Sequence, residues 1–216
     1  MLIDSVAWLG HAGFRIEAGA ATIYIDPYRV PADAPPADAI LVTHGHYDHF
    51  SPQDIQRLSN ESTWLVAPPP VAERVSGRVT SLAPGEGVEL DQLAGIEVAA
   101  IAAYNTSKRD SDGRAFHPRE AGGIGFDLNV RGERLYHSGD TDVIPEMDRV
   151  VGVDLALLAV SGTYVMTARE AAEAARRIQP RIAVPMNWGK HIGTRADADE
   201  FAERAPVEVR VLHPEG

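Results

Sequence analysis

The residues best suited to chemistry in this 216-residue chain form one short cluster near residue 45. It contains an aspartate and three of the chain's 8 histidines: His44, His46, Asp48 and His49. Imidazole nitrogens and carboxylate oxygens are the ligands that zinc accepts where no thiolate is present. Three imidazoles and a carboxylate are costly to hold this close together unless a cation binds them. The cluster therefore predicts a metal site for one ion or two.

A second polar cluster, Gly139 to Asp142, follows another β-prone run. Alone it would indicate a turn. Beside a histidine cluster, Asp140 becomes a candidate bridging ligand, since one carboxylate can place an oxygen on each of two metals. A third loop, Ser161-Gly162, also follows an apolar run and could reach the same edge. The chain has 0 cysteines, which excludes thiolate ligands, disulfides and cysteine nucleophiles and limits any metal site to His, Asp and Asn.

The elements that must position these clusters are short strands, which dominate the first two thirds of the chain. Short β-prone or apolar runs bounded by turn residues predict them. The predicted strands are Val6–Leu9, Phe14–Glu17, Thr22–Ile25, Ala39–Val42, Trp64–Ala67, Val79–Leu82, Gly87–Leu90, Ile96–Tyr104, Gly123–Val130, Arg134–His137, Asp154–Val160, Arg181–Met186 and Val207–Leu212. The polar segment Asn105 to Gly122 is predicted as a long loop, and long loops in compact domains tend to be functional.

Three helices are indicated by their start signals. Ser51-Pro52 places a capping serine before a proline, which favours a helix through Leu58. Thr167 to Glu170 is a capping box that opens a helix to Ile178, and a third helix is expected over Asp197–Arg204. The prolines at 68–70 are interpreted as a rigid turn. Strand and helix alternate in the last third of the chain, which is typical of an α/β fold.

Composition narrows the class of protein. Hydrophobic residues make up 44%, and the length suits one domain spanning 1–216. The 31 acidic and 20 basic residues give a net charge of −11, which disfavours nucleic-acid binding because phosphate neutralisation needs clustered Lys and Arg. We find no apolar run of about 18 residues, the minimum for a membrane span, and no signal-peptide pattern. A cytoplasmic protein without membrane or nucleic-acid partners is expected.

Several motifs together resemble the metallo-β-lactamase fold superfamily. After the apolar strand comes His44-X-His46-X-Asp48-His49, and the further motifs occur in the family's order: Trp8 to Phe14, Ile25-Asp26-Pro27, Tyr136 to Asp142, and Pro185-Met186-X-Trp188-Gly189. The branch they resemble includes ascorbate-6-phosphate-lactonase-like hydrolases and other metal-dependent hydrolases. The resemblance implies an α/β fold, a four-layer αββα sandwich with two metals at the edge between the sheets.

Carried over residue by residue, the resemblance implies two neighbouring metal sites. His44 and His46 would bind the first metal, and Asp48 and His49 the second. Asp140 would bridge both. The expected cofactor is zinc, one ion or two, with manganese as the alternative.

Two family ligands do not transfer directly. Asn105 stands where the family places a histidine of the first site, and His117 in the following loop is expected to replace that ligand. At the second site the family commonly has a histidine where this chain has Asn187, a poorer zinc ligand that would suit a harder ion such as manganese. His191 is a further candidate for compensating at that site.

Three other residues are candidates for contacts around the metals. His11 follows the first strand at a glycine-flanked turn and is expected to touch substrate or support a ligand. Asp26 could support the ligands through hydrogen bonds or simply form a turn with Pro27. Tyr164 could form a wall of the pocket, although a packing role is the ordinary interpretation.

The expected reaction is hydrolysis of a lactone, ester or phosphoester in a small molecule. A metal lowers the pKa of bound water from 15.7 to about 7, which makes hydroxide available as the nucleophile, and Asp48 could orient it or take its proton. The sequence contains no Gly-x-Ser-x-Gly nucleophile motif. The alternative is a non-catalytic metal-binding or ligand-sensing protein on the same fold, suggested by Asn105 and Asn187. A homo-oligomer is compatible with the sequence.

Overall fold

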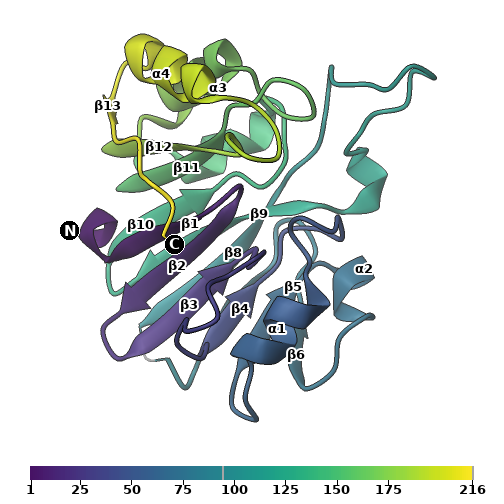
Figure 1. The fold of residues 1–216 in the computed structure, drawn as a ribbon, viewed down its shortest axis with the longest axis vertical. Helices are drawn as coiled ribbons and strands as arrows, with labels where there is room; N and C mark the ends of the chain where they lie inside the picture. The colour runs from purple at the N-terminus through teal and green to yellow at the C-terminus, as the bar shows by residue number, and fades with distance from the viewer. Residues whose placement is uncertain (94, 216) are drawn as a thin grey trace.

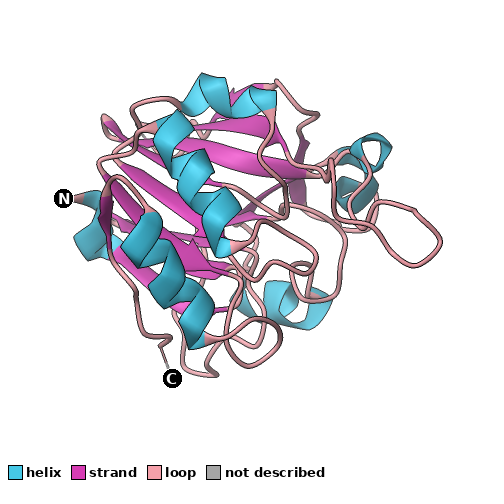
Figure 2. Ribbon diagram, turned by 90° about the horizontal axis from the view of Figure 1, so that it is seen from above, coloured by secondary structure: helices cyan, strands magenta, loops and turns pink. Residues whose placement is uncertain are grey.

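A computed structural model describes residues 1–93 and 95–215. Two β-sheets lie face to face, and helices cover the outer side of each sheet (Figure 1). Figure 2 shows the two longest helices side by side over the strands of the second sheet. This is the four-layer αββα sandwich expected from the sequence, and the predicted fold class is confirmed. Among the described residues, no helix is long and apolar enough to cross a membrane.

The first sheet has six strands in chain order. Antiparallel pairing joins the first three strands, and parallel pairing joins the third to the sixth. Their bounds are β1 (Val6–Gly10), β2 (Gly13–Ala18), β3 (Ala21–Ile25), β4 (Ala39–Leu41), β5 (Trp64–Ala67) and β6 (Arg78–Ser81). Two helices, α1 (Pro52–Leu58) and α2 (Pro69–Ala72), cover its outer face. A 3₁₀ turn, η1 (Leu2–Ser5), precedes β1.

The second sheet has seven strands in the order β13-β12-β11-β10-β9-β8-β7. Strands β7 to β10 pair antiparallel and β10 to β13 pair parallel. Their bounds are β7 (Gly87–Glu89), β8 (Ile96–Ala102), β9 (Ile124–Val130), β10 (Glu133–His137), β11 (Leu155–Ala159), β12 (Ile182–Met186) and β13 (Glu208–Val209). The remaining helical elements are α3 (Ala168–Ile178), α4 (Arg195–Arg204) and the 3₁₀ turns η2 (Arg119–Ala121) and η3 (Pro145–Val150).

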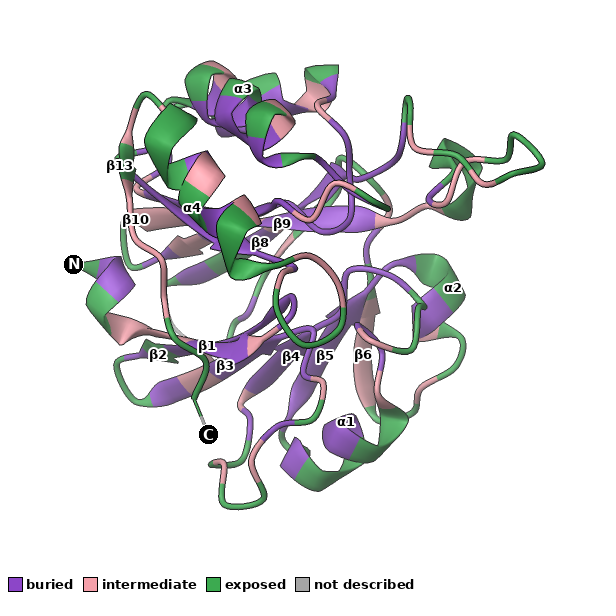
Figure 3. Ribbon diagram, turned by 45° about the horizontal axis from the view of Figure 1, so that its top comes forward, coloured by how far each residue is buried: buried purple, intermediate pink, exposed green. Residues whose placement is uncertain are grey.

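Three apolar layers hold the sandwich together. The largest lies between the two sheets and includes Phe14 and Phe126, both fully buried. A second layer seats α3, α4 and η3 on the second sheet around Tyr136 and Phe201. A third packs α1 and α2 on the first sheet around Tyr24. Figure 3 shows the buried sides of helices and strands turned toward these layers.

The start signals in the sequence account for α1 and α3 but did not predict α2. Ser51 Oγ accepts a hydrogen bond from Asp54 N, and Thr167 with Glu170 forms the expected capping box of α3. The predicted turn at prolines 68–70 is wrong: proline is tolerated in a first helical turn, and α2 begins at Pro69. Helix α4 starts two residues earlier than predicted, because Thr194 caps it and Asp197 is its third residue.

Parallel strands bring their carboxyl ends to one edge of the sandwich. Strands β1, β3 and β4 of the first sheet and β10 and β12 of the second all end at this edge, and each is followed within a few residues by a candidate site residue. Behind β10, Gly139 has a φ of +59°, and an added Cβ would lie 2.6 Å from the carbonyl oxygen of Ile124. Only glycine fits this approach of two backbones, and it turns the chain so that Asp140 faces the edge.

Candidate metal centre

Three imidazoles from two distant segments meet in a first cluster. His44 Nε2 lies 3.0 Å from His46 Nδ1, and His117 Nε2 lies 3.2 Å from the same atom. These three side chains each offer one ligand nitrogen within 4.8 Å of the others. His44 and His117 are buried, whereas His46 is exposed and marks the open side of the centre. The loop after β8 therefore brings His117 to the histidines that follow β4.

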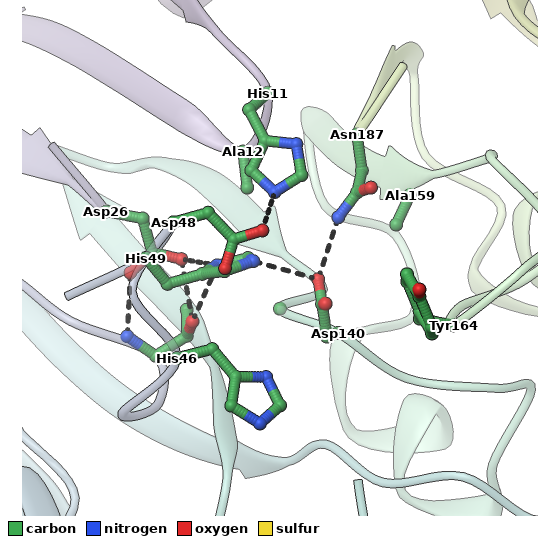
Figure 4. A network of polar contacts seen from close by, with 12 residues as sticks. His11, Ala12, Asp26, His46, Asp48, His49, Asp140, Ala159, Tyr164 and Asn187 are labelled. Atoms are coloured by element: carbon green, nitrogen blue, oxygen red, sulfur yellow. Dashed lines mark hydrogen bonds and ion pairs between the residues drawn. The ribbon is translucent and has the colours of Figure 1, made fainter. Parts of the chain in front are cut away.

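A second cluster consists of His11, Asp48 and His49, whose ligand atoms also lie within 4.8 Å of one another. His11 Nε2 lies 3.0 Å from Asp48 Oδ2, a contact drawn in Figure 4. Among the described residues, Nδ1 of His11 has no hydrogen-bond partner, whereas Nε2 of His11 and Nε2 of His49 lie 3.0 and 3.4 Å from carboxylate oxygens of Asp48 and Asp140 without hydrogen-bond geometry. Buried polar atoms are almost always hydrogen-bonded, so nitrogen–oxygen pairs this close without hydrogen-bond geometry favour a cation between them.

Asp140 lies between the two clusters and presents one oxygen to each. Its Oδ2 is 3.3 Å from His117 Nε2 in the first cluster, and its Oδ1 is 3.4 Å from His49 Nε2 in the second. Oδ1 also accepts a 2.9 Å hydrogen bond from the side-chain amide of Asn187 (Figure 4). Asn187 Oδ1 in turn accepts a hydrogen bond from Ser161 Oγ at 3.3 Å. Both carboxylate oxygens of Asp140 are thus directed where a bridging ligand needs them.

The carboxylate of Asp26 fixes the orientation of His49 in the second cluster. It accepts hydrogen bonds from Thr43 N at 2.8 Å and Thr43 Oγ1 at 2.6 Å, and lies 2.7 Å from His49 Nδ1. With Nδ1 engaged by Asp26, Nε2 of His49 is directed toward Asp140, as expected for a carboxylate that fixes the orientation of a ligating histidine. Thr43 Oγ1 also lies 2.9 Å from His44 Nδ1.

Asn105 plays the same part for the first cluster. Its Oδ1 accepts hydrogen bonds from the backbone N–H of His117 at 2.8 Å and lies 3.1 Å from His117 Nδ1. Its amide nitrogen donates to Asp142 Oδ1 at 3.2 Å. Asp142 Oδ2 accepts hydrogen bonds from Thr106 N and Ser107 N, at 2.7 and 2.6 Å, which fixes the start of the long loop. Asn105 therefore orients His117 through hydrogen bonds instead of facing the cluster as a metal ligand itself.

The buried charges of the centre are strongly coupled. Burial lowers the pKa of His44 well below its ordinary value, and the imidazole of His49 acts in the same direction. Burial also opposes protonation of His49, but the carboxylates of Asp140 and Asp26 outweigh it and raise that pKa well above its ordinary value. Burial alone would raise the pKa of Asp140, yet the imidazoles of His49 and His117 hold it well below the usual range. The carboxylate that would bridge two cations is therefore ionised.

These donors fit a pair of divalent cations. Each cluster supplies three ligand atoms, and Asp140 adds an oxygen to both. Imidazole with carboxylate suits zinc and also accepts manganese. Nε2 of His11 and Nε2 of His49 face carboxylate oxygens of Asp48 and Asp140 without hydrogen-bond geometry, which is the observation that favours a cation in the second cluster. Left-handed backbone at His11, Asp26 and Asn187, with φ of 51°, 46° and 59°, is the strain typical of functional sites.

The structure places some predicted site residues differently from the sequence expectation. His11, expected as a substrate contact or supporting residue, lies in the second cluster with a ring nitrogen within 4.8 Å of the ligand atoms of Asp48 and His49. Asn187, expected as a ligand, contacts the bridging carboxylate with its amide nitrogen. His191 lies one ring beyond His11, at 5.8 Å between centroids, outside both clusters. Tyr164 is half-exposed and packs edge-on against Phe116 at 4.7 Å, while its carbonyl accepts a hydrogen bond from Asn105.

One sequence signal could have identified His11 as a ligand candidate. It comes two residues after the end of a predicted strand, as His44 does, and sits between Gly10 and Gly13. Histidine at such a turn in left-handed backbone is uncommon and is held by its surroundings. Here the carbonyl of His11 accepts hydrogen bonds from Trp8 Nε1 at 3.0 Å and from Asn187 N at 2.8 Å. These contacts join the ends of β1 and β12, which sequence patterns cannot show.

Comparisons with known proteins agree with this fold and centre. A family described as beta-lactamase superfamily domain matches residues 5–187. A UPF0173 metal-dependent hydrolase of Methanopyrus kandleri is 30% identical over 97% of this chain and 96% of its own length. The crystal structure of a proposed metal-dependent hydrolase of Parabacteroides distasonis superposes with a TM-score of 0.84 at 28% identity, covering 97% of this chain and 93% of the other.

A metallo-beta-lactamase fold protein of Bacillus subtilis superposes with a TM-score of 0.74, covering 98% of this chain and 97% of the other. At 12% identity it supports the fold alone. The superfamily resemblance carried by the histidine and aspartate motifs is therefore confirmed, while the lactonase-like branch stays a prediction. The family match spans most of the chain, and the relative from Methanopyrus kandleri aligns along nearly its full length. The chain thus belongs to the beta-lactamase superfamily and, within it, to the UPF0173 metal-dependent hydrolases.

Proposed function

We propose that this protein hydrolyses a lactone, ester or phosphoester bond of a small molecule at a two-metal centre. The observation that carries the proposal is the pair of three-ligand clusters joined by Asp140, in which Nε2 of His11 and Nε2 of His49 lie close to carboxylate oxygens without hydrogen bonds to them. The proposed ligands are His44, His46 and His117 for the first metal, His11, Asp48 and His49 for the second, and Asp140 for both. Zinc is the proposed metal, with manganese as the alternative.

A bound divalent ion would lower the pKa of water toward neutrality and polarise the bond to be cleaved. Asp48 would orient the attacking water and accept its proton, because it is the least buried ligand of the second cluster, with a side chain 21% exposed. Burial opposes ionisation of Asp48, but the imidazoles of His11 and His49 outweigh it and lower its pKa, so Asp48 is present as the ionised carboxylate. Asp26 and Asn105 would hold the ligating imidazoles in fixed orientations throughout turnover.

The alternative of a metal-binding sensor without turnover loses part of its basis in this arrangement. It depended on two asparagines standing where imidazoles were expected. His117 stands at the first cluster beside Asn105, and His11 stands at the second beside Asn187. The donor count of each cluster is therefore sufficient for a hydrolytic centre.

Elemental analysis combined with a hydrolysis panel tests the proposal. We expect up to two equivalents of metal and turnover of a member of a lactone, aryl ester and phosphodiester panel. His46→Ala should abolish turnover and reduce metal content, whereas His213→Ala, a matched change at an exposed histidine outside both clusters, should alter neither. Full metal occupancy without turnover across the panel would reject hydrolysis and favour the sensor.

A further inference from the structure

A cavity of about 440 Å³ adjoins the second cluster and shares His11 with it. Its apolar wall is formed by Trp8 and Trp188, whose rings lie 4.8 Å apart at 34°. The indole N–H of Trp8 donates to the carbonyl of His11 at 3.0 Å, and that of Trp188 donates to Pro185 O at 3.1 Å. Because both indole N–H groups are satisfied inside the protein, the ring surfaces left to the cavity are apolar. The volume is that of a pocket for a small organic molecule.

The charged groups around this cavity are mainly cationic. Arg29 and Lys190 line it, and neither forms an ion pair with a carboxylate among residues 1–93 and 95–215. The one acidic residue of the lining, Glu215, is engaged by Arg15 at 2.8 Å. Two cations without carboxylate partners in the described part of a chain of net charge −11 mark a local surplus of positive charge. Such a surplus in a partly apolar cavity favours an anionic ligand.

Arg29 is held in place by its backbone. Its φ is +53°, and its N–H donates to Asp54 Oδ2 at 2.9 Å. Its guanidinium lies 5.1 Å from the ring centroid of Tyr28, and Nη1 lies 3.5 Å from His191 Nε2. A strained backbone persists where its surroundings enforce it, often at ligand-binding positions. The contacts with Tyr28 and His191 therefore place the guanidinium at the cavity, with no carboxylate paired to it among residues 1–93 and 95–215.

The cavity connects this cation to the metal centre. The rings of His11 and His191 are 5.8 Å apart, and Arg29 Nη1 lies 3.5 Å from His191 Nε2. Because His11, His191 and Arg29 all line the cavity, a substrate with its scissile bond at the second cluster can extend through the cavity toward Arg29. Trp8 and Trp188 line the same cavity, where an aromatic surface can pack against a flat ring.

We propose that the cavity binds the part of the substrate remote from the scissile bond, and that this part is an anionic group on a flat, apolar body. Arg29 and Lys190 would bind the anion, and Trp8 and Trp188 the apolar body. The inference rests on the proposed hydrolytic function for the bond that is cleaved. Binding of the anionic part needs no turnover, so the two proposals can fail separately.

A binding experiment tests the cavity itself. Metal-loaded protein is titrated with benzoate, phenylphosphonate and the neutral benzamide, following tryptophan fluorescence. Two of the chain's 3 tryptophans line the cavity, so occupancy should change the emission. We expect one or both anions to bind at least about tenfold more tightly than benzamide, as charge-assisted hydrogen bonds predict. Comparison of the two anions distinguishes a carboxylate from a phosphate-like group.

Matched variants separate the cavity from the metals as the anion's partner. The double variant Arg29→Gln with Lys190→Gln keeps the backbone hydrogen bond to Asp54 and should weaken anion binding about tenfold or more. Arg131→Gln removes a similar exposed charge from the turn between β9 and β10, at the opposite end of β10 from Asp140, and should have no effect. If the anion bound only to the metals, neither the double variant nor Arg131→Gln would change its affinity, and that result would overturn the inference.

A kinetic experiment compares anionic and neutral substrates in hydrolysis. We expect kcat/KM for 4-acetoxybenzoate to be about tenfold higher than for the neutral 4-acetoxybenzamide. In the double variant this preference should disappear, mainly because KM for the anion rises. Turnover of both esters with equal kcat/KM would reject the cavity proposal and leave the hydrolytic function standing. Anion binding that depends on Arg29 and Lys190, without turnover of either ester, would support the cavity and count against hydrolysis.

Discussion

Asn105→Ala should release the first metal selectively. The amide of Asn105 is buried and makes four hydrogen bonds: two with His117, one with Asp142 and one with the carbonyl of Tyr164. Alanine leaves Nδ1 of His117 without its acceptor, so the imidazole loses the contact that fixes its orientation. Loss of a group that orients a ligating histidine typically weakens metal binding about 10- to 100-fold.

The same substitution should also destabilise the fold. It leaves the buried N–H of His117 and the carbonyl of Tyr164 without the partners that Asn105 provides, and each buried unsatisfied group costs about 1–3 kcal/mol. Asp142 keeps its hydrogen bonds from Thr106 and Ser107, so its carboxylate remains satisfied. We therefore expect a loss of about 2–6 kcal/mol in the free energy of unfolding, which urea denaturation of the metal-free protein would measure.

Chelator competition distinguishes positioning of His117 from general destabilisation. The variant should lose one metal at about 10- to 100-fold lower chelator concentration than the wild type and keep the other. The second cluster keeps its metal because His11 and His49 make no hydrogen bond to Asn105. Asn129→Ala is the control, because it removes an amide with two hydrogen bonds that lies far from the centre, on β9. The positioning role would be refuted if Asn105→Ala lowered stability while both metal affinities stayed within about threefold of wild type. Such a change is smaller than the roughly 10- to 100-fold loss expected when a group that orients a ligating histidine is removed.

Three further outcomes are expected. His11→Gln should remove metal from the second cluster and leave one equivalent bound, measured by elemental analysis after dialysis; two equivalents would exclude His11 as a ligand. Metal binding should release a proton, because Asp140 helps to raise the pKa of His49 above its ordinary value, and the imidazole must be neutral to ligate. Affinity should then rise with pH through neutrality, and the binding enthalpy should depend on the buffer; equal enthalpies in phosphate and Tris would contradict this. Ser51→Ala removes the acceptor for Asp54 N at the start of α1 and should cost about 1 kcal/mol in urea denaturation, without changing metal content.

Local sequence signals were sufficient for most of the secondary structure. The strand predicted at Trp64–Ala67 has those bounds, and most others differ by one or two residues at an end. Alternation, apolar runs and capping residues are short-range properties, so the chain displays them without its tertiary partners. The strand predicted over Val207–Leu212 shrinks to Glu208–Val209, because its pairing with β12 extends over only two residues. Pairing length is decided by the neighbouring strand.

The composition of the candidate centre was also visible in the sequence, but the role of each residue was not. The spacing His44-X-His46-X-Asp48-His49 placed four metal-binding side chains within one loop, and the absence of cysteine limited the donors to imidazole, carboxylate and amide groups. The same information could not decide whether Asn187 or His11 is the candidate ligand at the second cluster. The difference depends on which side chain reaches His49 and which reaches Asp140.

The sequence by itself determined the fold class, the loop that concentrates the histidines and the chemistry those donors can support. Only the tertiary structure decided that His11 joins Asp48 and His49, that Asn105 orients His117, and that Arg29 lines the adjoining cavity with no carboxylate partner among the described residues. The physical reason is that these contacts join residues far apart in the chain. Parallel strands of two sheets end at one edge, and the packing of the sheets fixes which side chains meet there.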